Sequence, residues 1–167
     1  MGLDEQPPRW TGDREAISTP LACGLLALLV LLLNLNTLGA FFVGDDYDFL
    51  LRAARMDGLG DALRLTFWGE WEPAWWASWY LDFKLWGAEP LGYHLTNTLL
   101  LALAVVALFG LVRETWPESP PAAWAAALLF ATHPLHDEAV VYLAARGHVM
   151  AAALGDGYEV IEEGLNG

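Results

Sequence analysis

Residues 21–48 read LACGLLALLVLLLNLNTLGAFFVGDDYD, and this stretch decides the fold that we expect for the whole chain. Its first 23 residues, Leu21–Val43, carry no charged side chain. As one helix they would reach about 35 Å, enough to cross a bilayer core of about 30 Å, so we expect a retained membrane anchor. The acidic cluster Asp45, Asp46 and Asp48 follows where such a helix would meet water. These carboxylates either stay solvated at the helix end or act on a substrate carried by lipid.

The composition indicates an integral membrane protein. Of the 167 residues, 56% are hydrophobic and only 17% are charged, whereas soluble domains average about 45–50% apolar and about 25% charged residues. The net charge is −13, with only 8 lysines and arginines. No basic patch exists, so a nucleic-acid partner is not expected. A single cysteine, Cys23, excludes an internal disulfide.

Further apolar runs predict an all-α, polytopic fold with three membrane helices and an incomplete fourth. After the anchor, the runs are Leu95–Val112, Ala122–Thr132 and Ala139–Leu154. Arg9 and Arg14 favour a cytoplasmic N-terminus. We therefore expect a cytoplasmic tail at residues 1–20, the N-terminal part of a membrane domain at 21–154, and an atypical polar tail at 155–167.

Residues 44–92 are predicted to form a long outer loop with interfacial helices. The expected helices are Phe49–Met56, Ala62–Phe67 and Pro73–Trp86, the last stopped by Gly87. Within the last helix and just before it, Trp71, Trp75, Trp79 and Phe83 recur every four residues. This aromatic face either anchors the helix at the membrane surface or covers a pocket for a lipid or a sugar.

A second polar cluster is expected on the same outer face as the aspartates. His133, His136, Asp137 and Glu138 offer imidazole and carboxylate groups to a divalent cation, or they satisfy the ends of neighbouring helices. Arg146 lies inside the last apolar run, where an arginine needs an anionic partner. That partner is either a phosphate, which matches the guanidinium fork, or Asp137 or Glu138.

Three segments resemble a known family. They read GAEPLGYHLTN at 87–97, FATHPLHDEAV at 130–140 and ARG at 145–147. Together they resemble GT-C glycosyltransferases, in particular the protein O-mannosyltransferase-like branch. The resemblance implies a polyprenyl-phosphate-linked sugar as donor, membrane lipid as surroundings, and transfer on the outer face of the membrane.

The resemblance also implies roles for individual residues. Asp45 or Asp46 would be the general base that activates the acceptor. Arg146, His133, Tyr93 and His94 would bind the substrate near the lipid phosphate. The possible divalent metal would be held by His136, Asp137 and Glu138.

Three departures from the family suggest a fragment that is inactive alone, and one of them is that residues 155–167 resemble nothing in the family. Glu72 precedes Pro73 where the family carries a basic residue, and only three complete membrane helices are expected where such enzymes have about ten or more. The missing helices would come from a longer chain or a partner. The alternative is a small non-catalytic membrane protein that assembles with partner helices. For either, we expect a multi-pass protein of a bacterial inner (plasma) membrane.

Overall fold

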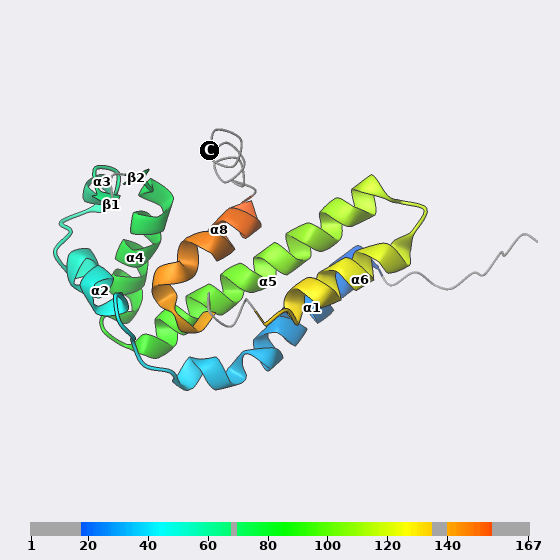
Figure 1. Ribbon diagram of the computed structural model, residues 1–167, viewed down its shortest axis with the longest axis horizontal. Coiled ribbons are helices and arrows are strands. Elements are labelled where there is room, and N and C mark those ends of the chain that lie inside the picture. The colour runs from blue at the N-terminus through cyan, green and yellow to red at the C-terminus, as the bar shows by residue number, and fades with distance from the viewer. Residues whose placement is uncertain (1–17, 68–69, 135–139, 155–167) are drawn as a thin grey trace, which may run out of the picture.

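The computed structural model describes residues 18–67, 70–134 and 140–154, and these residues form two lobes (Figure 1). One lobe is a bundle of the apolar helices α1 (Thr19–Leu33), α5 (Pro90–Thr115) and α6 (Pro120–Ala131). The other lobe consists of α2 (Asp46–Ala54), α3 (Leu59–Ala62), the two-residue strands β1 (Thr66–Phe67) and β2 (Glu70–Trp71), and α4 (Pro73–Trp86). The short helices η1 (Leu35–Gly39), η2 (Leu143–Ala145) and α8 (Arg146–Leu154) complete the described elements.

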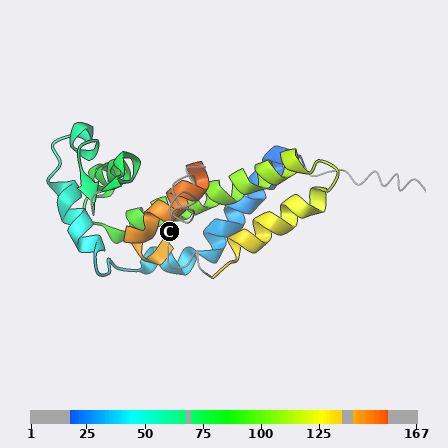
Figure 2. The same ribbon diagram turned by 45° about the horizontal axis from the view of Figure 1, so that its top comes forward.

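The three helices of the bundle share one apolar core (Figures 1 and 2). α6 contributes Ala123, Ala127 and Ala131, one residue every four, to the buried face. Small side chains let helix backbones approach closely. The outward faces carry leucines that are each at least 40% exposed: Leu21, Leu25, Leu28 and Leu32 of α1, Leu99, Leu103 and Leu111 of α5, and Leu128 and Leu129 of α6. So much exposed apolar surface suits lipid or further helices better than water.

Among the described residues, α5 is the one helix that is both long and apolar enough to cross a membrane. Its 26 residues reach about 39 Å. α1 and α6 are apolar but have only 15 and 12 residues, fewer than the about 20 that a span requires. The helical fold class is therefore confirmed, apart from the short pair of strands, in which Thr66 pairs with Trp71 and Phe67 with Glu70. Of the three predicted spanning helices, one meets both criteria.

The prediction of one continuous helix over Leu21–Val43 is wrong, because α1 ends at Leu33 and Asn34 caps it. The Asn34 side chain is buried and donates to the carbonyl of Val30 at 2.9 Å. The Thr37 hydroxyl in turn donates to the carbonyl of Asn34 at 2.7 Å. Short polar side chains that bond nearby carbonyls compete with the helical ladder, and here the chain leaves the α-helix before it reaches the acidic cluster.

The second lobe is built around an aromatic core. Trp75, Trp76 and Trp79 of α4 are at most 5% exposed and pack with Phe49 of α2 and Tyr93 of α5. Trp75 and Trp79 of the predicted aromatic face therefore lie in the protein interior and not at the membrane surface, which was one of the two roles predicted for that face.

Of two helices predicted in the loop, one has the predicted bounds and the other does not. α4 begins at Pro73 and ends at Trp86, as predicted, with Gly87 at a φ of +61°. That conformation favours glycine. The predicted helix Ala62–Phe67 is wrong, because α3 covers Leu59–Ala62 and the chain then enters β1.

Candidate functional site

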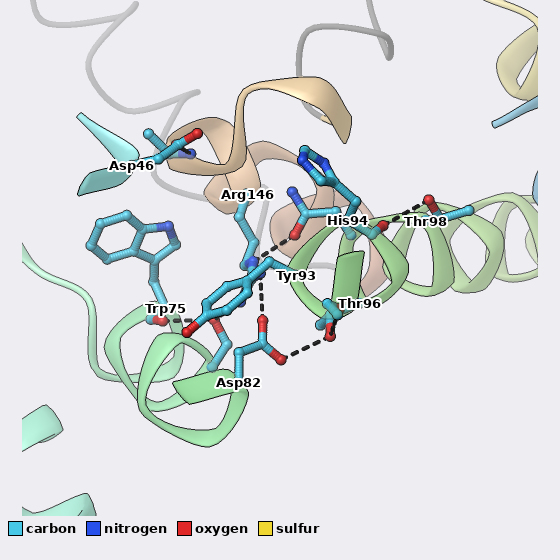
Figure 3. A network of polar contacts seen from close by, with 12 residues as sticks. Asp46, Trp75, Asp82, Tyr93, His94, Thr96, Thr98 and Arg146 are labelled. Atoms are coloured by element: carbon cyan, nitrogen blue, oxygen red, sulfur yellow. Dashed lines mark hydrogen bonds and ion pairs between the residues drawn. The ribbon is translucent and has the colours of Figure 1, made fainter. Parts of the chain in front are cut away.

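Arg146, the first residue of α8, lies at the centre of the buried polar network in Figure 3. Its side chain is fully buried, and Nη2 lies 2.6 Å from Oδ2 of Asp82 in α4. Nε donates to Oδ1 of Asn97 at 2.6 Å, and Nη1 donates to Oγ of Ser78 at 3.1 Å. The guanidinium also lies 5.1 Å from the centre of the Trp79 ring. Every nitrogen of the guanidinium is therefore engaged by α4 or α5.

Asp82 is the anionic partner that the sequence analysis did not consider. Its Oδ2 pairs with Arg146, and its Oδ1 accepts a hydrogen bond from the Thr96 hydroxyl at 2.8 Å. The expected alternatives were a phosphate, or Asp137 or Glu138, and the latter two lie outside the described residues. Because Asp82 neutralises the arginine, Arg146 has no need of a phosphate in order to be buried.

Asp46 begins α2 and is fully buried. Its Oδ2 accepts a hydrogen bond from the backbone N–H of Val43 at 3.0 Å, and its Oδ1 accepts one from the N–H of Ala144 at 2.8 Å. Burial raises the pKa of the Asp46 carboxyl above its ordinary value, while the N–H donors act in the opposite direction. One oxygen is thus bonded to the turn before α2, and the other ties α2 to η2.

Asp45, by contrast, is exposed. The phenol of Tyr142 donates to its Oδ2 at 2.9 Å. The Tyr142 ring lies beside Gly44, since a Cβ at that glycine would be 4.0 Å from Cε2 of the tyrosine. Gly44 has a φ of +54°, so the chain turns there before the two aspartates. Adjacent aspartates therefore occupy different environments, one buried and bonded to backbone, the other accessible and bonded to a phenol.

Tyr93 and His94 are both fully buried near the start of α5. The Tyr93 hydroxyl donates to the carbonyl of Gly87 at 2.8 Å. The His94 ring nitrogen Nδ1 lies 3.0 Å from the carbonyl of Val140, and because a carbonyl only accepts, this contact places a proton on Nδ1. In the described structure both side chains serve internal contacts, and neither is exposed to a ligand.

The remaining predicted residues lie elsewhere or outside the description. His133 is exposed just beyond α6, and its backbone N–H donates to the carbonyl of Phe130. His136, Asp137 and Glu138, predicted to bind a metal, lie outside the described residues. Within the described ranges no group of three or more histidine, cysteine, aspartate or glutamate residues could hold a metal ion.

Three members of the site were not predicted from the sequence: Asp82, Ser78 and Tyr142. A signal for Asp82 was present: it follows Trp79 by three residues, on the helix face that already carried Trp75. A carboxylate on a buried aromatic face requires a cation, and Arg146 was the cation in need of an anion. Tyr142 had no such signal, because an isolated tyrosine in an apolar run is most simply a core residue.

The arrangement brings an accessible carboxylate and a buried ion pair to the same region of the fold. Tyr142, Ala144 and Arg146 reach Asp45, Asp46 and Asp82, respectively, from one short segment of five residues. Chemically, an exposed carboxylate can accept a proton. The buried pair holds α8, α4 and α5 together.

Sequence comparison identifies relatives among curated proteins. Protein O-mannosyl-transferase Tmtc1 of Drosophila melanogaster is 39% identical over 137 residues, which cover 74% of this chain and 16% of that protein. Protein O-mannosyl-transferase Tmtc2 of the same fly is 36% identical over 143 residues, 77% of this chain and 15% of that protein. Protein O-mannosyl-transferase tmtc2 of Xenopus laevis is 35% identical over 144 residues, 75% of this chain and 16% of that protein.

The chain thus spans about a sixth of the length of these relatives. No family model matches the chain, and no solved structure matches it. All three relatives come from animals, so the predicted bacterial membrane has no support from them.

Proposed function

Because the chain is a homologue of part of the protein O-mannosyl-transferases of the GT-C superfamily, we propose that it forms the acceptor-activating part of a membrane glycosyltransferase. The donor would be a sugar linked to a polyprenyl phosphate. The names of the relatives support mannose as the sugar and an oxygen of a protein as the acceptor. The whole reaction would need the remaining parts of such an enzyme.

We assign the role of general base to Asp45 and not to Asp46. The observation that carries the assignment is the difference in access: Asp45 is exposed, whereas Asp46 is buried with both oxygens bonded to backbone N–H groups. A base must come within about 2.6–3.2 Å of the proton that it takes. Asp46 is fully buried, so an acceptor could not reach it without opening the structure around it.

In the proposed step, the Asp45 carboxylate takes the proton of the acceptor hydroxyl as its oxygen attacks the anomeric carbon of the sugar. A new bond forms between that carbon and the acceptor oxygen. The bond from the carbon to the phosphate oxygen breaks, and the polyprenyl phosphate leaves with the electron pair. The charge of Arg146 is already neutralised by Asp82. Arg146 would therefore hold the surrounding helices together and would not bind the phosphate. His133, which is exposed, remains a candidate ligand for the donor phosphate.

We further propose a polytopic arrangement in a membrane. α5 would cross the bilayer, and the aromatic lobe with Asp45 would lie on the outer face. The cytoplasmic side would carry the turn between α5 and α6. Arg113, in the last turn of α5, favours that side. A divalent metal held by His136, Asp137 and Glu138 also stays a proposal.

A second candidate function is a non-catalytic membrane protein that assembles with partner helices. The exposed leucines of α1, α5 and α6 favour it, because apolar faces of this kind are suited to helix packing as well as to lipid. Removal of Asp45 distinguishes the two functions: it should abolish transfer by an enzyme and leave helix assembly unchanged.

A chimeric protein tests the proposed function. This chain would replace the matching 137-residue part of Drosophila melanogaster Tmtc1, and mannosyl transfer would be measured in membranes with equal protein levels. Asp45→Asn should lower transfer by about 10²–10⁴-fold, the usual scale for loss of a general base. The chain alone should transfer no sugar.

Asp48→Asn is the matched control. Asp48 is an exposed aspartate in the same segment, so its amide variant should transfer at the unsubstituted rate. If the Asp45→Asn chimera keeps transfer within about threefold of its parent, Asp45 is not the base.

A further inference from the structure

We propose that Tyr142 is a positioning residue that holds the Asp45 carboxylate in its reactive orientation. The proposal rests on the assignment of Asp45 as the base and deepens it. It concerns a residue that the three family-like segments do not include, since Tyr142 lies between the segments at 130–140 and 145–147.

Tyr142 contacts two consecutive residues of the turn before α2, Gly44 and Asp45. Its phenol donates to Oδ2 of Asp45 at 2.9 Å, and its ring lies beside Gly44, the preceding residue. An exposed aspartate would otherwise sample several rotamers, and ordering it at the moment of reaction costs free energy. A phenol already bonded to one oxygen removes that freedom before the acceptor arrives.

The phenol also sets which oxygen reacts. Oδ2 is occupied by the bond from Tyr142, so the acceptor proton would go to Oδ1.

Tyr142 can hold Asp45 because the segment behind it is fixed. Leu143, the next residue, is fully buried, and the N–H of Ala144 donates to Asp46 at 2.8 Å. Arg146 then joins Asp82 at 2.6 Å. Because this segment is firmly attached, the Tyr142 phenol has a fixed position relative to α4 and α5. The bond to the phenol therefore holds Asp45 in a fixed position as well.

Carboxyl footprinting of the whole 167-residue chain in lipid nanodiscs tests the inference without any activity. A carbodiimide and an amine would modify accessible carboxyl groups, and mass spectrometry would give the rate at each aspartate. Tyr142→Phe keeps the ring beside Gly44 and removes only the phenol oxygen. We expect the modification rate of Asp45 to rise at least twofold, with the rate of buried Asp46 unchanged.

Tyr47→Phe is the matched control. It removes an exposed phenol two residues from Asp45, and its ring contacts Phe42. It should leave the rate of Asp45 unchanged. An unchanged rate of Asp45 in Tyr142→Phe would overturn the inference. So would a rise at both Asp45 and Asp46, because it would show that Tyr142 supports the local fold and not one carboxylate.

The chimera with Drosophila melanogaster Tmtc1 separates failure of this inference from failure of the proposed function. Tyr142→Phe should lower kcat about tenfold and leave the KM for the donor unchanged. If Asp45 becomes more reactive in the footprint but kcat does not change, Tyr142 still holds Asp45. In that case the assignment of Asp45 as the base is wrong.

Discussion

At the scale of single residues, the GYHLTN segment is explained by packing. Gly92 lies against the ring of Trp86, and the Tyr93 hydroxyl reaches the carbonyl of Gly87. Thr96 and Asn97 supply the hydrogen bonds that surround the buried ion pair. The motif that carries the family resemblance therefore joins the aromatic lobe to α5, and its residues need not touch a substrate in order to be required.

Gly92 gives the sharpest stability prediction at this scale. A Cβ at this position would lie inside the van der Waals envelope of the Trp86 ring. Gly92→Ala should therefore lower the free energy of unfolding by about 1–3 kcal/mol, the usual cost of overpacking. Denaturant unfolding in detergent, followed by circular dichroism, measures it.

Gly110→Ala is the control for this substitution. Gly110 lies in the same helix, and a Cβ there would meet no side chain of the described residues within 4 Å. Alanine there should be neutral or stabilising by about 0.5–1 kcal/mol, because glycine is the weaker helix former. Equal effects of the two substitutions would contradict the contact with Trp86.

Asp46 makes stability depend on pH in a defined direction. Because burial raises its folded pKa above the ordinary 3.8, the folded state prefers the neutral carboxyl. The stability that the neutral Asp46 carboxyl contributes is fully present below the pKa of the unfolded state. It is lost as the pH rises through the pKa of the folded state. Unfolding of the parent and of Asp46→Asn would be compared from acidic to neutral pH. The parent should lose stability relative to the variant as the pH rises. A relative gain would mean that the N–H donors outweigh burial.

At the scale of elements, the Arg146–Asp82 pair is the connection between α8 and α4. Arg146→Met would leave Asp82 buried without its cation, and we expect unfolding to become easier by about 3–5 kcal/mol. The double variant Arg146→Met, Asp82→Leu removes both charges and should recover most of that loss. Denaturant unfolding of the parent, both single variants and the double variant measures the coupling. If the loss in the double variant equals the sum of the two single losses, the pair does not couple α8 to α4.

Elements with local signals could be predicted from the sequence. α4 was bounded by Pro73 and Gly87, and each acts through its own backbone conformation. α5 was predicted from its long apolar run. α1 was predicted too long, because Asn34 ends the helix through a side-chain bond that hydropathy does not register.

Pairings between distant residues could not be predicted in the same way. That Arg146 needs an anion follows from its apolar surroundings, but the choice of Asp82 depends on how α4 crosses α5. Likewise the sequence placed both aspartates in the site, and only the fold separates the exposed Asp45 from the buried Asp46. Tyr142 entered through the same long-range packing.

At the scale of the whole molecule, the two ends of α5 define two sides. The aromatic lobe lies at its N-terminal end, and the turn to α6 lies at the other (Figures 1 and 2). Arg113, near the C-terminal end of α5, donates to the Thr19 hydroxyl at the start of α1 at 2.7 Å. α1 and α5 are therefore antiparallel, and the start of α1 lies on the same side as the turn between α5 and α6.

This geometry predicts the topology of the chain in a membrane. About 39 Å of helix separates the two ends of α5, more than a bilayer core of about 30 Å, so Asp57 in the aromatic lobe and Glu118 in the turn should lie on opposite sides. Single cysteines at these exposed positions, in a Cys23→Ala background, would be treated with an impermeant thiol reagent. Asp57→Cys should react in intact cells, and Glu118→Cys only after the membrane is opened, because Arg113 favours the cytoplasmic side. Reaction of both in intact cells would show that α5 does not span, and the reverse pattern would place Asp45 on the cytoplasmic face.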